Sequence, residues 1–156
     1  MMRKRLFAPI MCLTSALLLG SASVARAQVS VWAGVGGSRE AGVSTFAKDV
    51  KQAGVQLTVP LLPLAIRGDA LLLGNDFKTE NLSYNVNAVA VMKLPLLQPY
   101  ALAGRGSYVI APNTPKESGW NYGAGVRLGV SRFGAFLEMR RHDPLKRTIT
   151  TLGITF

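Results

Sequence analysis

Six charged residues stand at alternate positions in segments that are otherwise apolar or small, and they are the side chains here best placed to do chemistry. They are Arg67, Asp69, Arg105, Arg127, Glu138 and Arg140. Isolated charges in an enclosed space are costly, so we expect each acid to pair with arginines. The expected partners are Arg105, Arg127 or Arg140 for Glu138, and Arg67 or a charge opposite it for Asp69.

Four arginines against two acids leave a positive surplus, which has two interpretations. The first is a hydrated arginine cluster that stabilises the fold by filling an enclosed interior. The second is a narrow anion-preferring path or a site for a small acidic ligand. The sequence leaves both open.

The chain has few of the residues from which catalytic or metal-binding sites are built. The only histidine is His142, followed by Asp143-Pro144-Leu145, and the only cysteine is Cys12. Nucleophilic catalysis needs a nucleophile, a base and an orienting group on a common face, and no such set is visible. Zinc sites need several His, Cys or acidic ligands. We therefore expect no enzyme activity, no cofactor and no metal, with His142 a polar residue of a surface loop.

Residues 1–27 have the three parts of a secretory signal peptide: a basic start, an apolar stretch over 6–20 and a small-residue cleavage site ending at Ala27. The apolar stretch contains Pro9 and is shorter than the roughly 20 residues of a membrane helix. Cleavage after Ala27 leaves residues 28–156 as one domain. It removes four of the 18 basic residues and no acid, so the formal charge falls from +10 to +6. Export argues against nucleic acid as a partner.

Eight segments of the remaining chain alternate between apolar residues and small or polar ones, as strands with one apolar face do. They are 28–37, 51–60, 62–73, 82–94, 99–109, 120–130, 133–141 and 147–156. Their lengths, about 9 to 13 residues, suit tilted membrane-crossing strands, whereas soluble sheets favour about 5 to 6.

The connections between these segments also alternate in length. Short ones, at 60–63, 95–98 and 131–132, follow long ones at 38–50, 74–81 and 110–119, and 142–146 is intermediate. Outer-membrane barrels have short turns at one end and longer loops at the other. The predicted fold is therefore all-β, an eight-stranded antiparallel up-and-down transmembrane β-barrel.

The two-residue turn at 131–132 predicts the register of its flanking strands. It pairs Val130 with Phe133, Leu128 with Ala135, Val126 with Leu137 and Ala124 with Met139, and it sets Arg127 opposite Phe136 and Gly125 opposite Glu138. Apolar residues thus share the outer face and charges share the inner one.

Alternation also assigns the aromatic residues to faces. Trp120, Tyr122, Tyr84 and Tyr108 are expected outward near the loop end, Tyr100 and Phe156 outward near the turn end, and Trp32 and Phe136 inward. In segment 99–109, Leu102 is expected outward as well, which puts Arg105 inside the barrel.

The final segment, R-T-I-T-T-L-G-I-T-F, places Leu152, Ile154 and Phe156 on one face. It resembles the C-terminal targeting strand of bacterial outer-membrane β-barrels, and residues 28–156 resemble the small barrels of the OmpA/OmpX type. The resemblance implies a location in the cell outer membrane, handling of the last strand by the barrel-insertion machinery, and contacts with outer-membrane lipid and lipopolysaccharide. It also implies a monomer.

Some barrels that resemble this one modify lipid A, and those of the deacylase type carry a histidine and a serine two residues apart on an outer face. His142 has no serine at that spacing. The expected function is therefore a non-enzymatic structural or surface-interaction role. The alternatives are a narrow anion-preferring channel through the arginine-rich lumen and a lipid-modifying enzyme.

Overall fold

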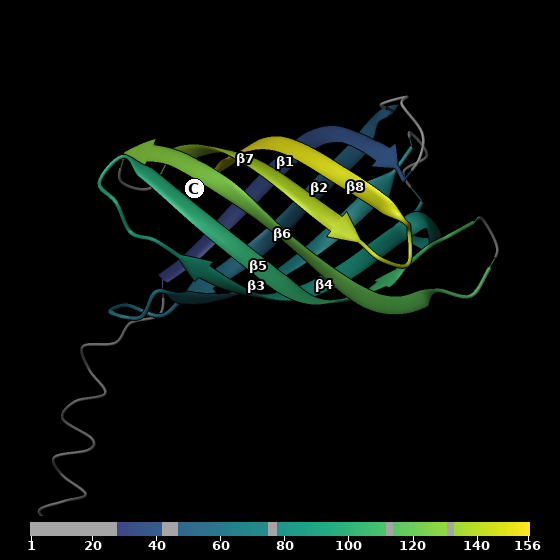
Figure 1. Ribbon diagram of the computed structural model, residues 1–156, viewed down its shortest axis with the longest axis horizontal. Helices are drawn as coiled ribbons and strands as arrows, with labels where there is room; N and C mark the ends of the chain where they lie inside the picture. The colour runs from purple at the N-terminus through teal and green to yellow at the C-terminus, as the bar shows by residue number, and fades with distance from the viewer. Residues whose placement is uncertain (1–27, 42–46, 75–77, 112–113, 131–132) are drawn as a thin grey trace, which may run out of the picture.

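The computed structural model describes residues 28–41, 47–74, 78–111, 114–130 and 133–156, which form one closed barrel (Figure 1). Its strands are β1 (Gln28–Glu40), β2 (Ala47–Thr58), β3 (Leu64–Leu73), β4 (Leu82–Val91), β5 (Leu97–Tyr108), β6 (Glu117–Val130), β7 (Phe133–His142) and β8 (Arg147–Thr155). A 3-10 turn, η1 (Thr79–Asn81), precedes β4. None of the described residues forms a helix long and apolar enough to cross a membrane.

Each strand pairs antiparallel with the next, and β8 returns to pair with β1. At the seam, the Val31 N–H donates to the Phe156 carbonyl at 2.7 Å and the Phe156 N–H donates to the Val31 carbonyl at 2.9 Å. Closure leaves no strand edge with unpaired backbone groups. The predicted eight-stranded antiparallel up-and-down barrel is confirmed.

The barrel has two ends, which we call the turn end and the loop end. Connections 59–63 and 92–96 lie at the turn end, together with the start of β1 and the ends of β6 and β8 (Figure 1, left). The ends of β1, β3, β5 and β7 lie at the loop end. The long connection expected over 38–50 shrinks to 41–46, because the backbone of Ser38 pairs with both Ala47 and Ile149 and so extends the sheet.

The register predicted for β6 and β7 is confirmed at every position. Val130 lies opposite Phe133, Leu128 opposite Ala135, Val126 opposite Leu137, Ala124 opposite Met139, Arg127 opposite Phe136 and Gly125 opposite Glu138. The turn residues 131–132 lie outside the described residues.

The two faces of the sheet differ in polarity. All eight strands expose large apolar side chains on the outside: Val29, Val31, Val35, Val55, Leu57, Leu64, Ile66, Val86, Leu97, Leu128, Leu137, Met139, Leu152 and Ile154. The buried interior is largely polar: Gln52, Gln56, Arg67, Asp69, Asn85, Asn87, Asn121, Glu138, Arg140 and Thr151. This is the reverse of the usual arrangement in a soluble domain.

The orientation predicted for β5 is wrong. Tyr100, Leu102 and Tyr108 are buried in the lumen, whereas Ala101 and Ala103 are exposed on the outside. The middle of the outer face of β5 has only the small residues Ala101 and Ala103, and the inner face includes glycines, so hydrophobicity alone does not distinguish the two faces. The tertiary structure does, since the lumen offers the Tyr100 hydroxyl a hydrogen-bond acceptor.

Apolar clusters occupy the lumen on both sides of its polar middle. Toward the turn end, Ala65, Val89, Tyr100 and Leu102 pack together, with Val91 against them. Toward the loop end, Val50, Leu71 and Ile149 form a second cluster, joined by Leu73 and Leu145.

Leu72 is the exception on the outer face, because it was expected to be exposed and is only 2% exposed. Lys51 lies directly opposite it in the sheet and its Nζ donates to the Gly74 carbonyl at 3.4 Å. Leu82 lies opposite Leu72 on its other side, so Leu72 is flanked in the sheet by two partly buried side chains.

Candidate functional site

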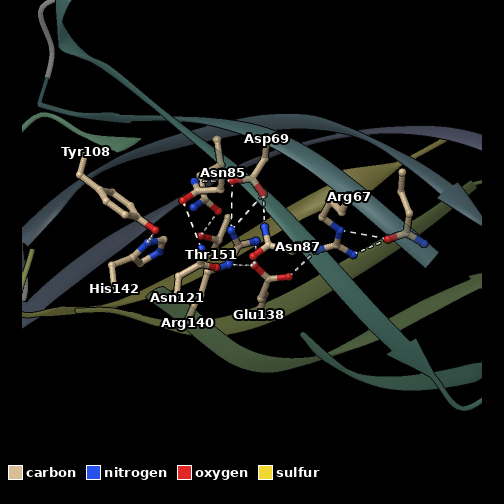
Figure 2. Close-up of polar contacts among 12 residues, drawn as sticks. Arg67, Asp69, Asn85, Asn87, Tyr108, Asn121, Glu138, Arg140, His142 and Thr151 are labelled. Atoms are coloured by element: carbon tan, nitrogen blue, oxygen red, sulfur yellow. Dashed lines mark hydrogen bonds and ion pairs between the residues drawn. The ribbon is translucent and has the colours of Figure 1, made fainter. Parts of the chain in front are cut away.

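Two strands on opposite sides of the barrel supply the charges at its centre. Arg67 and Asp69 lie two residues apart on β3, and Glu138 and Arg140 lie two residues apart on β7. Side chains two apart on a strand share a face, so both pairs point inward. Figure 2 shows these four side chains meeting in the lumen, and we call them the central network.

Arg140 joins the two acids of the central network. Its Nη2 lies 2.6 Å from Glu138 Oε1, and its Nη1 lies 3.0 Å from Asp69 Oδ1. Arg67 Nη1 lies 2.6 Å from the other oxygen of Glu138, Oε2. Two of these three ion pairs cross the lumen from β3 to β7, between residues 71 positions apart. The network is therefore a product of barrel closure.

Neutral side chains also donate hydrogen bonds to the Asp69 carboxylate. The Nδ2 atoms of Asn85 and Asn87, on β4, donate to its two carboxylate oxygens at 2.8 and 3.1 Å. Asn121, on β6, continues the chain by donating to Asn85 Oδ1 at 3.4 Å. The carboxylate thus accepts from uncharged donors as well as from Arg140.

Arg67 is held equally firmly on the turn-end side. Gln56 Oε1 accepts from its Nε at 3.0 Å and from its Nη2 at 2.7 Å. Its guanidinium carbon lies 5.1 Å from the ring centre of Trp32 and 5.0 Å from that of Tyr100. The Tyr100 hydroxyl in turn donates to Glu138 Oε2 at 2.9 Å. Every nitrogen of the Arg67 guanidinium therefore has a partner.

The central network is locally neutral, since its two arginines balance its two acids. No member exposes more than 8% of its side chain. Removing one partner of such a buried pair leaves an uncompensated charge, which costs about 3–5 kcal/mol. The acids are already engaged by arginines, so the arrangement suits stabilisation of the lumen and leaves neither acid poised as a catalytic base.

The pairing differs in part from expectation. Glu138 does bind Arg140, one of its three predicted partners, but its second partner is Arg67. Asp69 takes the alternative of a partner across the lumen, Arg140, in preference to Arg67 on its own strand. Arg140 reaches Asp69 because β7 lies opposite β3 in the closed barrel, while Arg67 is engaged by Gln56 and Glu138.

Arg105 was expected in the lumen, and that expectation is wrong. It is exposed on the outer face of β5, with its guanidinium carbon 5.6 Å from the ring centre of Trp120. In the sheet it lies between Val86 and Trp120, both exposed. The misplacement follows from the reversed faces of β5, because Tyr100 and Arg105 necessarily point to opposite sides.

Arg127 does face the lumen but does not join the central network. It lines a cavity at the turn end together with Gln98 and Phe136. Among the described residues, none forms an ion pair or hydrogen bond with its guanidinium. The predicted surplus of positive charge is therefore reduced to Arg127.

Sequence reasoning missed the tyrosines and the histidine of the interior. His142 was expected in a surface loop, but it ends β7 and is fully buried. Its Nδ1 lies 3.1 Å from the Tyr108 hydroxyl, and the two rings meet edge to face (Figure 2). The even spacing of Glu138, Arg140 and His142 would have predicted this placement if the expected segment 133–141 had been extended by one residue.

The described part of the chain offers no set of side chains that could bind a metal ion together. No group of three or more His, Cys, Asp or Glu side chains there could hold a metal ion.

The apolar face predicted for the final segment points away from the lumen. Leu152, Ile154 and Phe156 are all exposed on the outside of the barrel.

The comparison with solved structures bears on the fold. The barrel is similar to the crystal structure of Ail, the attachment invasion locus protein of Yersinia pestis, with a TM-score of 0.54 and 16% sequence identity over 83% of this chain and 97% of that one. No protein-family model and no curated protein matches the sequence. The likeness shows a shared fold, the one that the resemblance to small outer-membrane barrels implied.

Proposed function

We propose that this chain is an exported barrel embedded in a bacterial outer membrane, where it has a non-enzymatic structural or surface-interaction role. The observation that carries the proposal is the apolar exterior, to which all eight strands contribute exposed Val, Leu, Ile or Met side chains. A soluble protein rarely exposes so large an apolar surface, whereas lipid covers it in a membrane barrel. The closed hydrogen-bonded sheet meets the other requirement of a bilayer.

Export fits the proposal. Residues 1–27, read as a signal peptide cleaved after Ala27, lie outside the described residues, and residues 28–156 are the barrel domain. The last strand offers Leu152, Ile154 and Phe156 as an exposed apolar face, which suits handling by the barrel-insertion machinery. In this orientation the turn end lies in the periplasm and the loop end outside.

The proposed partners of the outer face are membrane lipid and lipopolysaccharide. Near the loop end, exposed Trp120 and Tyr122 supply the aromatic side chains that favour a membrane interface. Two cations lie over aromatic rings there: Arg105 over Trp120, and Lys116 over Tyr84 with its Nζ 4.7 Å from the ring centre. These cations suit lipid phosphates. The barrel is proposed to act as a monomer without nucleic acid.

A surface-interaction role also has the support of the structural neighbour, which is described as an attachment invasion locus protein. The channel alternative has less support, because the ion-paired central network occupies the middle of the described lumen and an apolar cluster lies on each side of it. A lipid-modifying activity is tested by mass analysis of lipid A from cells with and without the protein; an altered acylation pattern would establish an enzyme.

The membrane proposal is tested by fractionation and gel mobility. Expressed with residues 1–27, the protein is expected in the outer-membrane fraction, starting at residue 28 by N-terminal sequencing. An unboiled sample in detergent should migrate differently from a boiled one, because the closed barrel stays folded. Recovery as a soluble periplasmic protein without a mobility shift would overturn the proposal.

A further inference from the structure

The lumen contains a small cavity at the turn end that the central network closes on its inner side. The cavity has a volume of about 30 Å³, room for one small ion or about two water molecules. Arg67 and Gln56 form its inner wall, and Trp32 and Phe136, which meet edge to face at 5.2 Å, form an aromatic wall. It is therefore a blind pocket.

Arg127 is the charged residue of this cavity whose guanidinium has no binding partner among the described residues. Arg67, its neighbour in the cavity wall, has every guanidinium nitrogen engaged by Gln56 or Glu138. Arg127 is half-buried, and within the described ranges no acid or carbonyl binds its guanidinium. Since the central network is neutral, Arg127 holds the uncompensated charge of the described lumen. A positive charge partly removed from water is stabilised by an anion.

A second donor lies directly beside Arg127. Gln98 on β5 is opposite Arg127 in the sheet, and both side chains line the cavity. Gly134, on the adjacent strand β7, leaves space for the Arg127 side chain: a Cβ added there would lie 3.1 Å from Arg127 Nε. The two side chains thus present a guanidinium fork and an amide N–H to the same small space.

We propose that the turn end of the lumen is a binding site for one small carboxylate, held by Arg127 and Gln98. A guanidinium matches the two oxygens of a carboxylate in a bidentate fashion, and an amide N–H supplies a further donor. The aromatic wall of Trp32 and Phe136 suits a short apolar substituent. The cavity volume limits the buried part to about the size of acetate.

Tryptophan fluorescence reports directly on this site. The chain has two tryptophans, so Trp120→Phe leaves Trp32, in the cavity wall, as the sole reporter. The protein is purified from membranes in detergent and titrated with sodium acetate, with sodium chloride balancing the ionic strength. A saturating change in Trp32 emission is expected. Emission that changes linearly, or does not change, would overturn the proposal.

Matched arginine variants in the same background test the residue assignment. Arg127→Gln should weaken acetate binding about tenfold or more, the usual cost of losing a charged hydrogen-bond partner. Arg105→Gln, outside the barrel, should change it less than twofold. Equal effects of the two variants would show that acetate responds to overall charge and would overturn the site.

The boiling shift in gel mobility establishes that each variant is folded before it is titrated. If Arg127→Gln does not fold, Gln98→Leu takes its place, and we expect a several-fold weaker apparent affinity. Unchanged acetate affinity in that variant would show that Gln98 does not bind acetate and would contradict the proposed site. The gel test also separates the two proposals, because a folded barrel that binds no acetate refutes the site alone.

Discussion

The two faces of β7 place opposite chemistry on adjacent residues. Glu138 and Arg140 point inward, each 1% exposed, and pair across the lumen with Arg67 and Asp69. Leu137 and Met139 point outward, 49% and 60% exposed, with no protein neighbour covering them. The contrast teaches that each face is matched to its own surroundings. The inner face is stable only through specific partners, whereas the outer face requires only that its side chains be apolar.

The largest effect is expected from breaking the inner face. Arg140→Met leaves the carboxylates of Glu138 and Asp69 buried without their shared partner, and should lower the free energy of unfolding by about 3–5 kcal/mol. Urea unfolding of the barrel in lipid vesicles measures it. The control is Arg141→Met, the next residue, whose ion pair with Asp143 is long, 3.9 Å, and half-exposed; it should cost less than about 1 kcal/mol. Similar losses would contradict the buried network.

The outer face should respond to charge next most strongly. Leu137→Arg places a cation where lipid is proposed, and should impair stability in vesicles by about 2–4 kcal/mol near the bilayer midplane. Leu137→Met keeps the face apolar and is the control, expected to be nearly neutral. If both variants insert and unfold alike, the outer face of β7 does not meet lipid.

Glycines provide a smaller comparison between inside and outside. A Cβ at Gly125 would lie 2.5 Å from the Tyr100 ring, so Gly125→Ala must displace the tyrosine and should cost about 1–3 kcal/mol. At Gly68, on the exposed side of β3, a Cβ would meet nothing within 4 Å. Gly68→Ala serves as the matched control in the same unfolding assay. A cost at Gly68 equal to that at Gly125 would argue against this packing.

The smallest effect is expected at Arg105. Its contact with Trp120 is an exposed cation–π pair, so Arg105→Gln should reduce stability by about 0.5–1 kcal/mol. Comparing this variant with Trp120→Leu and with the double variant isolates the pair, since the two losses should not add. A loss of stability as large as that of Arg140→Met would indicate that Arg105 lies inside the lumen.

Prediction from sequence succeeded where both faces of a strand had a clear character. In β6 and β7, large apolar residues alternate with glycine or charge, and the short turn left a single register that satisfies both strands. In β5, the outer face has Ala101 and Ala103 and the inner face has Leu102. The more apolar face is therefore the inner one, and it was wrongly assigned to lipid. Alternation separates two faces but does not say which is inside.

The sequence by itself determined the number of strands, the alternation of their faces and the inward direction of five of the six charged side chains expected in the lumen, because strand periodicity and hydrophobicity are local properties. Only the tertiary structure decided which charges meet. Arg140 binds Asp69 from 71 residues away because closure puts β7 across from β3, and Arg105 is excluded because Tyr100 found its acceptor on the opposite face. Partners across a lumen depend on how the whole sheet closes, which no single strand encodes.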